Sequence, residues 1–193
     1  MTDRYAEYRK LARDLAVDAV ALVPGPNFVR LFKQNFHSHE RPLVVLIPAT
    51  GAPVALVPNL ELRSFDLLKF EGEVFDWRDQ TGYRDAFSAM AAAMPVRSLA
   101  VEGQVMRVFV HHALIAANPG LQMIDAEKQI SGLRIHKSAD EIAALEDAIK
   151  LSETALEEAI SKVRAGMSET DVERILTLAL FSNGAEEHAF GPI

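Results

Sequence analysis

The sequence contains no cysteine, which excludes disulfides, thiolate zinc sites, iron–sulfur clusters and a cysteine nucleophile. Basic residues are in the minority, since 20 Lys and Arg stand against 27 Asp and Glu for a net charge of −7. The clustered basic face that nucleic-acid binding requires is therefore not expected. No apolar stretch approaches the roughly 20 residues of a membrane-spanning helix, and residues 1–5 form no hydrophobic leader. The sequence predicts a cytoplasmic protein that binds neither nucleic acid nor membrane.

What is present is an alternation of strand and helix patterns over the first two thirds of the chain, with 49% apolar residues available for a core. A hairpin is predicted because the turn-forming residues 48–53 separate two apolar runs. Strands are expected at residues 19–23, 43–47, 54–57, 74–77, 98–102 and 121–125, and helices at residues 3–15, 27–32, 59–69, 83–94 and 105–117. This order predicts an α/β domain, a mixed sheet flanked by helices.

From Ser138 onward the strand patterns stop. Ser138 and Glu141 have the spacing of a helix capping box, and the helix that they open is expected to run to residue 165 and end at Gly166. A second helix is expected to open at Ser168 and end before Gly184. Both helices carry apolar residues every third or fourth position and must bury them against something. We therefore expect a first domain at residues 1–132 and, at residues 133–193, the truncated start of a second.

Histidines are the first candidates for chemistry. His37 and His39 are two residues apart, so on an extended segment their imidazoles would share one face and could bind one metal ion. A third ligand at a useful spacing is missing, so contact between a loop histidine and a substrate is a better interpretation than a metal site. His111 and His112 lie on an expected helix, where neighbours point about 100° apart and cannot share a metal. Their role is predicted to be structural.

The other candidates lie at chain turns. Glu186, Glu187 and His188 cluster after the last helix without forming the His-Glu-x-x-His motif, and His188 or Phe190 could line a site, since ligands gather at such loops. Glu102 ends an expected strand, where a lone acid is more often a helix cap. The sequence contains no Gly-x-Ser-x-Gly elbow, phosphate-binding loop or dinucleotide-binding glycine motif.

Three groups of residues resemble the Xaa-Pro peptidase (prolidase, aminopeptidase P) and creatinase family of "pita-bread" metallopeptidases. Residues 19–28 (AVALVPGPNF) are similar to its first strand and Asn-aromatic turn, and residues 38–48 (SHERPLVVLIP) to its Ser-x-Glu-Arg-Pro and hairpin. Residues 134–142 (RIHKSADEI), 165–169 (AGMSE) and 184–190 (GAEEHAF) are similar to the entry of its catalytic domain. The resemblance implies a creatinase-like amino-terminal domain followed by two helices that open an α+β pita-bread domain.

The resemblance also implies a function, the hydrolysis of the peptide bond before proline by a homodimer. Two divalent metal ions (Mn, Co or Zn) would be held by two aspartates, a histidine and two glutamates from later strands. No position here matches those ligands, so this chain is expected to bind no metal and, alone, to be an inactive segment that serves dimerisation and substrate enclosure. In relatives this part can reach the partner subunit's active site, and Phe36 and His37 are the nearest candidates for contact with a proline-containing peptide.

Residues 31–34 (LFKQ) depart from the Tyr-Leu-Thr-Gly-like pattern that follows the Asn-aromatic turn in the family. This departure keeps open a second function, a creatinase-like amidinohydrolase with the same fold. The absence of a metal-ligand set in the sequence keeps open a third, a non-catalytic dimerisation or binding module.

Overall fold

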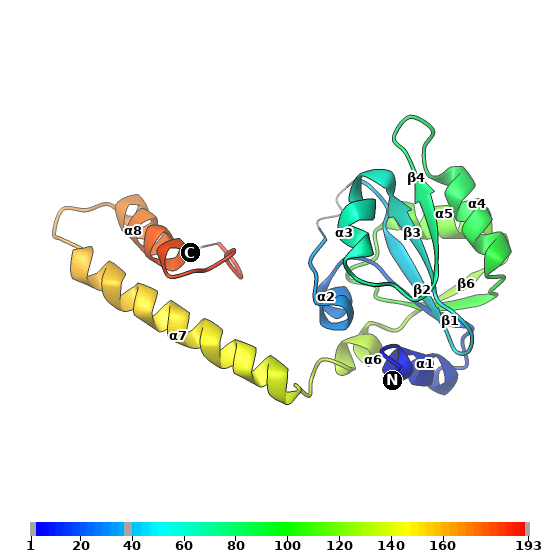
Figure 1. Ribbon diagram of the computed structural model, residues 1–193, viewed down its shortest axis with the longest axis horizontal. Coiled ribbons are helices and arrows are strands. Elements are labelled where there is room, and N and C mark those ends of the chain that lie inside the picture. The colour runs from blue at the N-terminus through cyan, green and yellow to red at the C-terminus, as the bar shows by residue number, and fades with distance from the viewer. Residues whose placement is uncertain (1–2, 37–39, 192–193) are drawn as a thin grey trace. The chain divides into compact units, whose positions relative to one another are not determined.

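The structure, a computed structural model, describes residues 3–36 and 40–191 and contains two compact units, Met1–His136 and Lys137–Ile193 (Figure 1). The first unit is built on one six-stranded sheet in the order β4-β3-β2-β1-β5-β6. Its strands are β1 (Ala19–Leu22), β2 (Val44–Pro48), β3 (Val54–Pro58), β4 (Glu73–Trp77), β5 (Ser98–Val101) and β6 (Gln122–Asp125). The pairs β1/β2 and β2/β3 are antiparallel and the others parallel. The predicted mixed sheet and hairpin are confirmed.

Helices cover both faces of this sheet (Figure 1). They are α1 (Ala6–Asp14), α2 (Pro26–Phe32), the 3₁₀ turn η1 (Asn59–Glu61), α3 (Leu62–Asp66), α4 (Arg84–Ala93), α5 (Val108–Ala117) and α6 (Glu127–Gly132). Successive side chains of a strand point to opposite faces. In β1, Val20 and Leu22 join the core under α1, α2, α3 and α6, whereas Ala19 and Ala21 join the core under α4 and α5.

Aromatic rings dominate the core on the α2 side of the sheet. The rings of Phe28 and Phe32 have centroids 4.6 Å apart, and Phe36, Phe65 and Phe70 continue the cluster. Rings of this size bury large apolar areas and prefer the tilted and edge-on contacts that are seen here. This cluster fixes α2 and the chain that leaves it against the sheet.

The second unit is a pair of helices, α7 (Ala139–Lys162) and α8 (Glu169–Ser182). The predicted capping box at Ser138 is present, since Ser138 Oγ accepts from the Glu141 amide at 3.2 Å. The second helix opens at Ser168 as expected and has a capping box of its own, in which Ser168 Oγ accepts from the Asp171 amide at 3.2 Å. The expected end of the first helix at residue 165 is wrong, because Val163 has already turned to an extended conformation. Residues 185–191, which follow α8, form neither a helix nor a strand.

Helix α6 was not expected from the sequence; its one buried side chain, Ile130, packs into the core beside α1. The helices of the described ranges include none that is both long and apolar enough to span a membrane.

Gly72 provides a test of the sheet's packing. A Cβ on Gly72 would lie 2.0 Å from the Pro53 carbonyl oxygen, at the turn into β3 and β4, where backbone has little room to move. We expect Gly72→Ala to lower the free energy of unfolding of the first unit by about 1–3 kcal/mol. Denaturant unfolding followed by the fluorescence of Trp77, the only tryptophan, measures this.

The matched control is Gly132→Ala, because no atom lies within 4 Å of a Cβ at Gly132, the last residue of α6. We expect this variant to be unchanged or up to about 1 kcal/mol more stable, since alanine is the better helix former. Equal stabilities for the two variants would contradict the close approach at Gly72.

Candidate functional site

The sheet has one point where ligands would be expected on topological grounds. β1 and β5 are parallel neighbours, and the chain leaves β1 into α2 on one face but leaves β5 into α5 on the other. In α/β sheets such a switch point opens a crevice at the carboxyl ends of the strands, and ligands bind there. The residues at that edge follow Leu22 and Val101.

In this protein the switch point is filled by its own side chains. Asn27 and Glu102 are 0% and 1% exposed, and Asn27 Nδ2 donates to Glu102 Oε1 at 2.6 Å. Tyr8 donates its hydroxyl hydrogen to the Asn27 carbonyl oxygen at 3.2 Å. Burial raises the pKa of Glu102 and raises that of Tyr8 to about 12. The interpretation of Glu102 as a helix cap is wrong, because the carboxyl group binds a side chain 75 residues away.

Carboxylates from β6 and α6 complete the edge of this switch point. Asp125 Oδ1 accepts from the Gly103 amide at 3.3 Å and from the Glu127 amide at 3.0 Å, and Glu127 Oε2 accepts from the Gln104 amide at 3.2 Å. A Cβ on Gly103 would lie 2.6 Å from the Asp125 carboxylate. The chain ends that follow β5 and β6 are therefore held together by backbone amides and carboxylates that bind one another.

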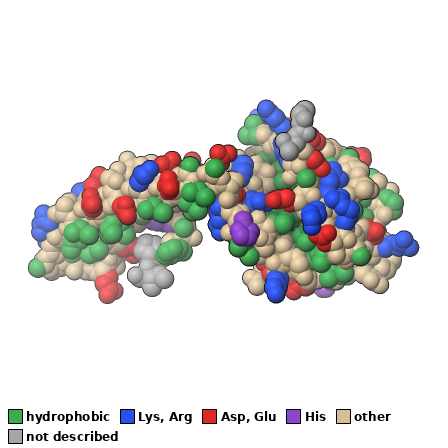
Figure 2. Space-filling view, turned by 90° about the horizontal axis from the view of Figure 1, so that it is seen from below, with side chains coloured by type: hydrophobic (Ala, Val, Ile, Leu, Met, Phe, Trp, Pro, Cys, Tyr) green, Lys and Arg blue, Asp and Glu red, His purple; other side chains and the backbone are tan. Residues whose placement is uncertain are grey.

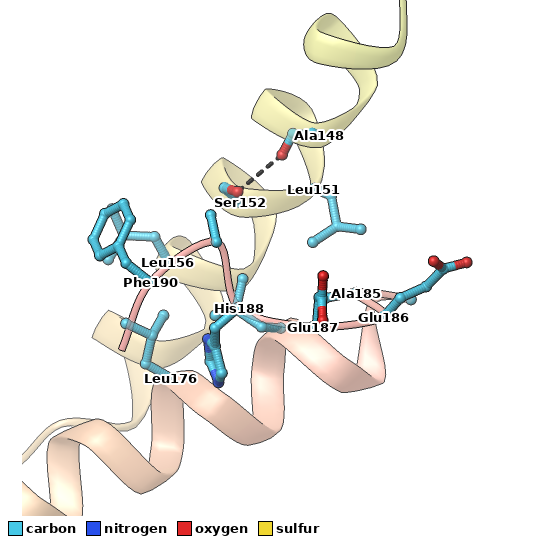
Figure 3. A pocket seen from close by; sticks show the side chains of 13 residues that line it. Ala148, Leu151, Ser152, Leu156, Leu176, Ala185, Glu186, Glu187, His188 and Phe190 are labelled. Carbon is cyan, nitrogen blue, oxygen red and sulfur yellow. Dashed lines mark hydrogen bonds between the residues drawn. The ribbon is translucent and has the colours of Figure 1, made fainter. Parts of the chain in front are cut away.

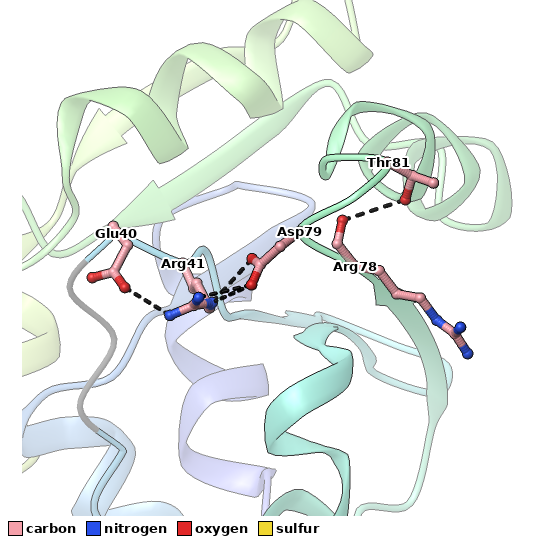
Figure 4. Close-up of polar contacts among 5 residues, drawn as sticks. All are labelled: Glu40, Arg41, Arg78, Asp79 and Thr81. Carbon is pink, nitrogen blue, oxygen red and sulfur yellow. Dashed lines mark hydrogen bonds and ion pairs between the residues drawn. The ribbon is translucent and has the colours of Figure 1, made fainter.

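A second group of polar residues borders residues 37–39. These three residues, which include the predicted site residue His37, lie outside the described part of the chain. Arg41 pairs with Asp79 through two parallel contacts, Nε to Oδ1 at 3.0 Å and Nη2 to Oδ2 at 2.7 Å, and its Nη1 contacts Glu40 at 2.7 Å (Figure 4). This pairing lowers the pKa of Asp79 and raises that of Arg41. Trp77 Nε1 donates to the Pro42 carbonyl oxygen at 3.0 Å, so residues 40–42 are bound to the end of β4.

The structure places Phe36, the other residue predicted to contact substrate in the first unit, in the aromatic core. Its side chain is 7% exposed, and its ring centroid lies 5.6 Å from that of Phe28 and 6.3 Å from that of Phe65. The substrate contact of Phe36 stays a prediction. What the geometry adds is that the chain is anchored on both sides of residues 37–39, by Phe36 before them and by Arg41 after them.

The third candidate is an apolar groove of about 600 Å³ in the second unit, between α7, α8 and the segment that follows α8 (Figure 3). It contains both remaining predicted site residues. The His188 ring stands edge-on to the Phe181 ring with centroids 5.3 Å apart, and Phe190 is 76% exposed. Leucines from both helices form the walls, which include Leu151, Leu156, Leu176 and Leu180.

Exposed apolar side chains continue along α7 beyond the groove, as the green patches of Figure 2 illustrate. They include Ile142, Leu145, Ile149 and Ile160. Exposed apolar side chains that gather along one helix usually mark a contact with another part of a protein. Among residues 3–36 and 40–191, no three His, Asp or Glu side chains are grouped so that they could hold a metal ion.

Comparison with known proteins agrees with this two-unit organisation. Residues 4–136 match the family described as Creatinase/Prolidase N-terminal domain. An uncharacterized peptidase of Staphylococcus epidermidis is 24% identical over 184 residues, which cover 95% of this chain and 51% of that protein. The chain thus spans about half the length of that relative.

Two solved structures share the fold. An Xaa-Pro dipeptidase from Bacillus anthracis has a TM-score of 0.81 at 18% identity, covering 97% of this chain and 50% of its own. A prolidase from Thermococcus sibiricus has a TM-score of 0.84 at 23% identity, covering 100% of this chain and 54% of its own. Both units, in this order, therefore occur together in those proteins.

The open groove can be tested with anilinonaphthalene sulfonate, a dye that fluoresces on exposed apolar surface. We expect the 193-residue chain to bind the dye, and Leu176→Asn to weaken the fluorescence several-fold because Leu176 lines the groove. Leu178→Asn is the matched control, since Leu178 lies on the same helix, is 62% exposed and does not line the groove. An equal loss in both variants would show that the dye binds elsewhere.

Proposed function

The chain belongs to the creatinase/prolidase N-terminal domain family, and we propose that it is the amino-terminal half of a Xaa-Pro dipeptidase that hydrolyses the peptide bond before proline. The observation that carries the proposal is the family match over residues 4–136 followed by the capped helix pair α7–α8. The solved structures of the Bacillus anthracis Xaa-Pro dipeptidase and the Thermococcus sibiricus prolidase contain both parts in the same order. In this proposal residues 137–193 are the first part of the catalytic domain.

The exposed apolar stripe of α7 supports the assignment to a longer protein. Ile142, Leu145 and Ile149 are each about half exposed although they follow a regular helical stripe. At roughly 25 cal/mol for each Å² of apolar surface removed from water, covering such a stripe stabilises a protein by several kcal/mol. In the proposed full-length enzyme the remainder of the catalytic domain covers it.

The first unit serves dimerisation and substrate enclosure in this proposal. The anchors on either side of residues 37–39 support it, because they bind the chain before and after these residues to the rest of the first unit. Phe36 holds one end by burial, and the Arg41–Asp79 pair holds the other. His37 is then the residue that contacts the proline-containing peptide, in the active site of the partner subunit of a homodimer.

The described residues do not fit the pair of divalent metal ions that the family resemblance implies. No cluster of three or more potential ligands occurs among them, and His188 stands against Phe181 rather than among carboxylates. We therefore assign no metal ligand and no chemical step to this chain. Its proposed contribution is binding and positioning.

The activity itself is tested with Xaa-Pro dipeptides in the presence of added manganese or cobalt. We expect no cleavage by the 193-residue chain, and cleavage by a form that continues past Ile193 to the length of the relatives. Creatine is the comparison substrate. Cleavage of creatine instead of Xaa-Pro dipeptides by the longer form would favour the amidinohydrolase. Activity toward neither substrate would favour the binding module. Robust cleavage of Xaa-Pro dipeptides by the 193-residue chain would contradict the proposal that this chain only binds and positions.

The role of His37 is tested in the same longer form. We expect His37→Ala to lower kcat/KM for a Xaa-Pro dipeptide at least about tenfold, or ~1.4 kcal/mol of transition-state binding, with an unchanged melting temperature. The control is His112→Ala, which removes an exposed histidine from α5. Equal values of kcat/KM in the two variants would exclude the contact.

A further inference from the structure

The polar pair at the switch point leaves two buried atoms without partners. Asn27 Nδ2 donates to Glu102 Oε1 at 2.6 Å. The other oxygen of each group, Asn27 Oδ1 and Glu102 Oε2, is buried and has no hydrogen-bond partner among the described residues. An unsatisfied buried polar atom destabilises the folded state, so two of them in one pair call for an explanation.

Protonation of Glu102 explains both atoms together. An ionised carboxylate is only an acceptor, and an amide oxygen is also only an acceptor, so neither can satisfy the other. A carboxylic acid, in contrast, has one O–H donor and one acceptor oxygen, and a carboxamide has the complementary N–H donor and acceptor oxygen. Such a pair can form two reciprocal hydrogen bonds, of which the Nδ2–Oε1 contact is one.

We propose that Glu102 is a neutral carboxylic acid in the folded domain and donates from Oε2 to Asn27 Oδ1, so that the pair acts as a pH-sensitive latch between the end of β5 and the first turn of α2. In the latched state every polar atom of the pair has a partner. Loss of the proton would place a negative charge, buried beside Asn27 Oδ1, at the closed switch point. The expected consequence is a weaker hold on the first turn of α2, at Asn27.

The surroundings of Glu102 favour the neutral form. The largest cause is removal of the carboxyl group from water, which raises the pKa of Glu102, and the negative charge of Glu127 on α6 raises it as well. The hydrogen bond from Asn27 and the positive charge of Arg134 lower this pKa. Tyr8 on α1, with a pKa of about 12, stays uncharged over the range in which Glu102 titrates. The remaining charged groups at this edge are Asp125, which accepts from the Gly103 amide, and Arg30 on α2, which interacts with Tyr8.

The sign of the pH dependence follows from the raised pKa. A carboxyl group whose pKa in the folded state lies above its unfolded value, about 4.5, binds its proton more tightly in the folded state. Its contribution to stability is fully present below about pH 4.5 and is lost as the pH rises through the folded-state pKa. This is opposite to an exposed carboxylate in an ion pair, such as Asp79, whose pKa is lowered.

The test is a ¹³C NMR titration of the glutamate side-chain carboxyl carbons in the 193-residue chain. We expect one resonance to titrate at clearly higher pH than all other glutamates and to be absent from Glu102→Gln. In Glu127→Gln that resonance should persist and titrate at somewhat lower pH, because a nearby negative charge is removed. Titration of Glu102 together with the exposed glutamates, such as Glu153 and Glu157, would overturn the proposal.

Stability gives a second, independent readout. The glutamine of Glu102→Gln can donate from Nε2 to Asn27 Oδ1 and accept from Asn27 Nδ2, so it reproduces the latch at every pH. We expect the unfolding free energy of the unaltered protein, followed by Trp77 fluorescence, to fall relative to that of Glu102→Gln as the pH rises above 4.5. A Glu102→Gln protein that does not fold, or that is far less stable than the unaltered protein at neutral pH, would overturn the proposal.

Discussion

Strand β1 has no exposed side chain, and the first unit is organised by the need to cover both of its faces. Its four residues are 0–1% exposed. β1 pairs with β2 in the antiparallel sense and with β5 in the parallel sense. The chain leaves β1 into α2 on one face of the sheet and leaves β5 into α5 on the other. At the resulting switch point, the polar backbone groups at the carboxyl ends of β1 and β5 meet in a buried position. The Asn27–Glu102 pair fills this switch point. The position of this buried polar pair is thus a consequence of the sheet topology.

Features that depend on a few neighbouring residues could be predicted from the sequence. The capping boxes at Ser138 and Ser168 involve residues three apart, and the turn between β2 and β3 contains Gly51, whose φ of 95° suits glycine. Helix α6 escaped prediction because six residues with one buried side chain are too short to display a helical period. The end of α7 could not be found either, because no breaker precedes Gly166 and the chain turns already at Val163.

The candidate sites divide in the same way. His188 and Phe190 could be proposed because a loop after a helix often carries function, and they do line the groove. The groove itself could not be foreseen, since its walls come from α7 and α8 and depend on how these helices pack. The partner of Glu102 is 75 residues away, so no local pattern connects it with Asn27, and only the folded sheet brings the two groups together.

The helix pair of the second unit meets through its smallest side chains. Ala155 and Ala159 on α7 and Ala179 on α8 are its buried residues, whereas the larger leucines stand along the groove beside them. Because the distance between packed helices depends on the side chains at their contact, these methyl groups act as spacers that determine how wide the groove is. The width of the groove therefore depends on three alanines, none of which lines it.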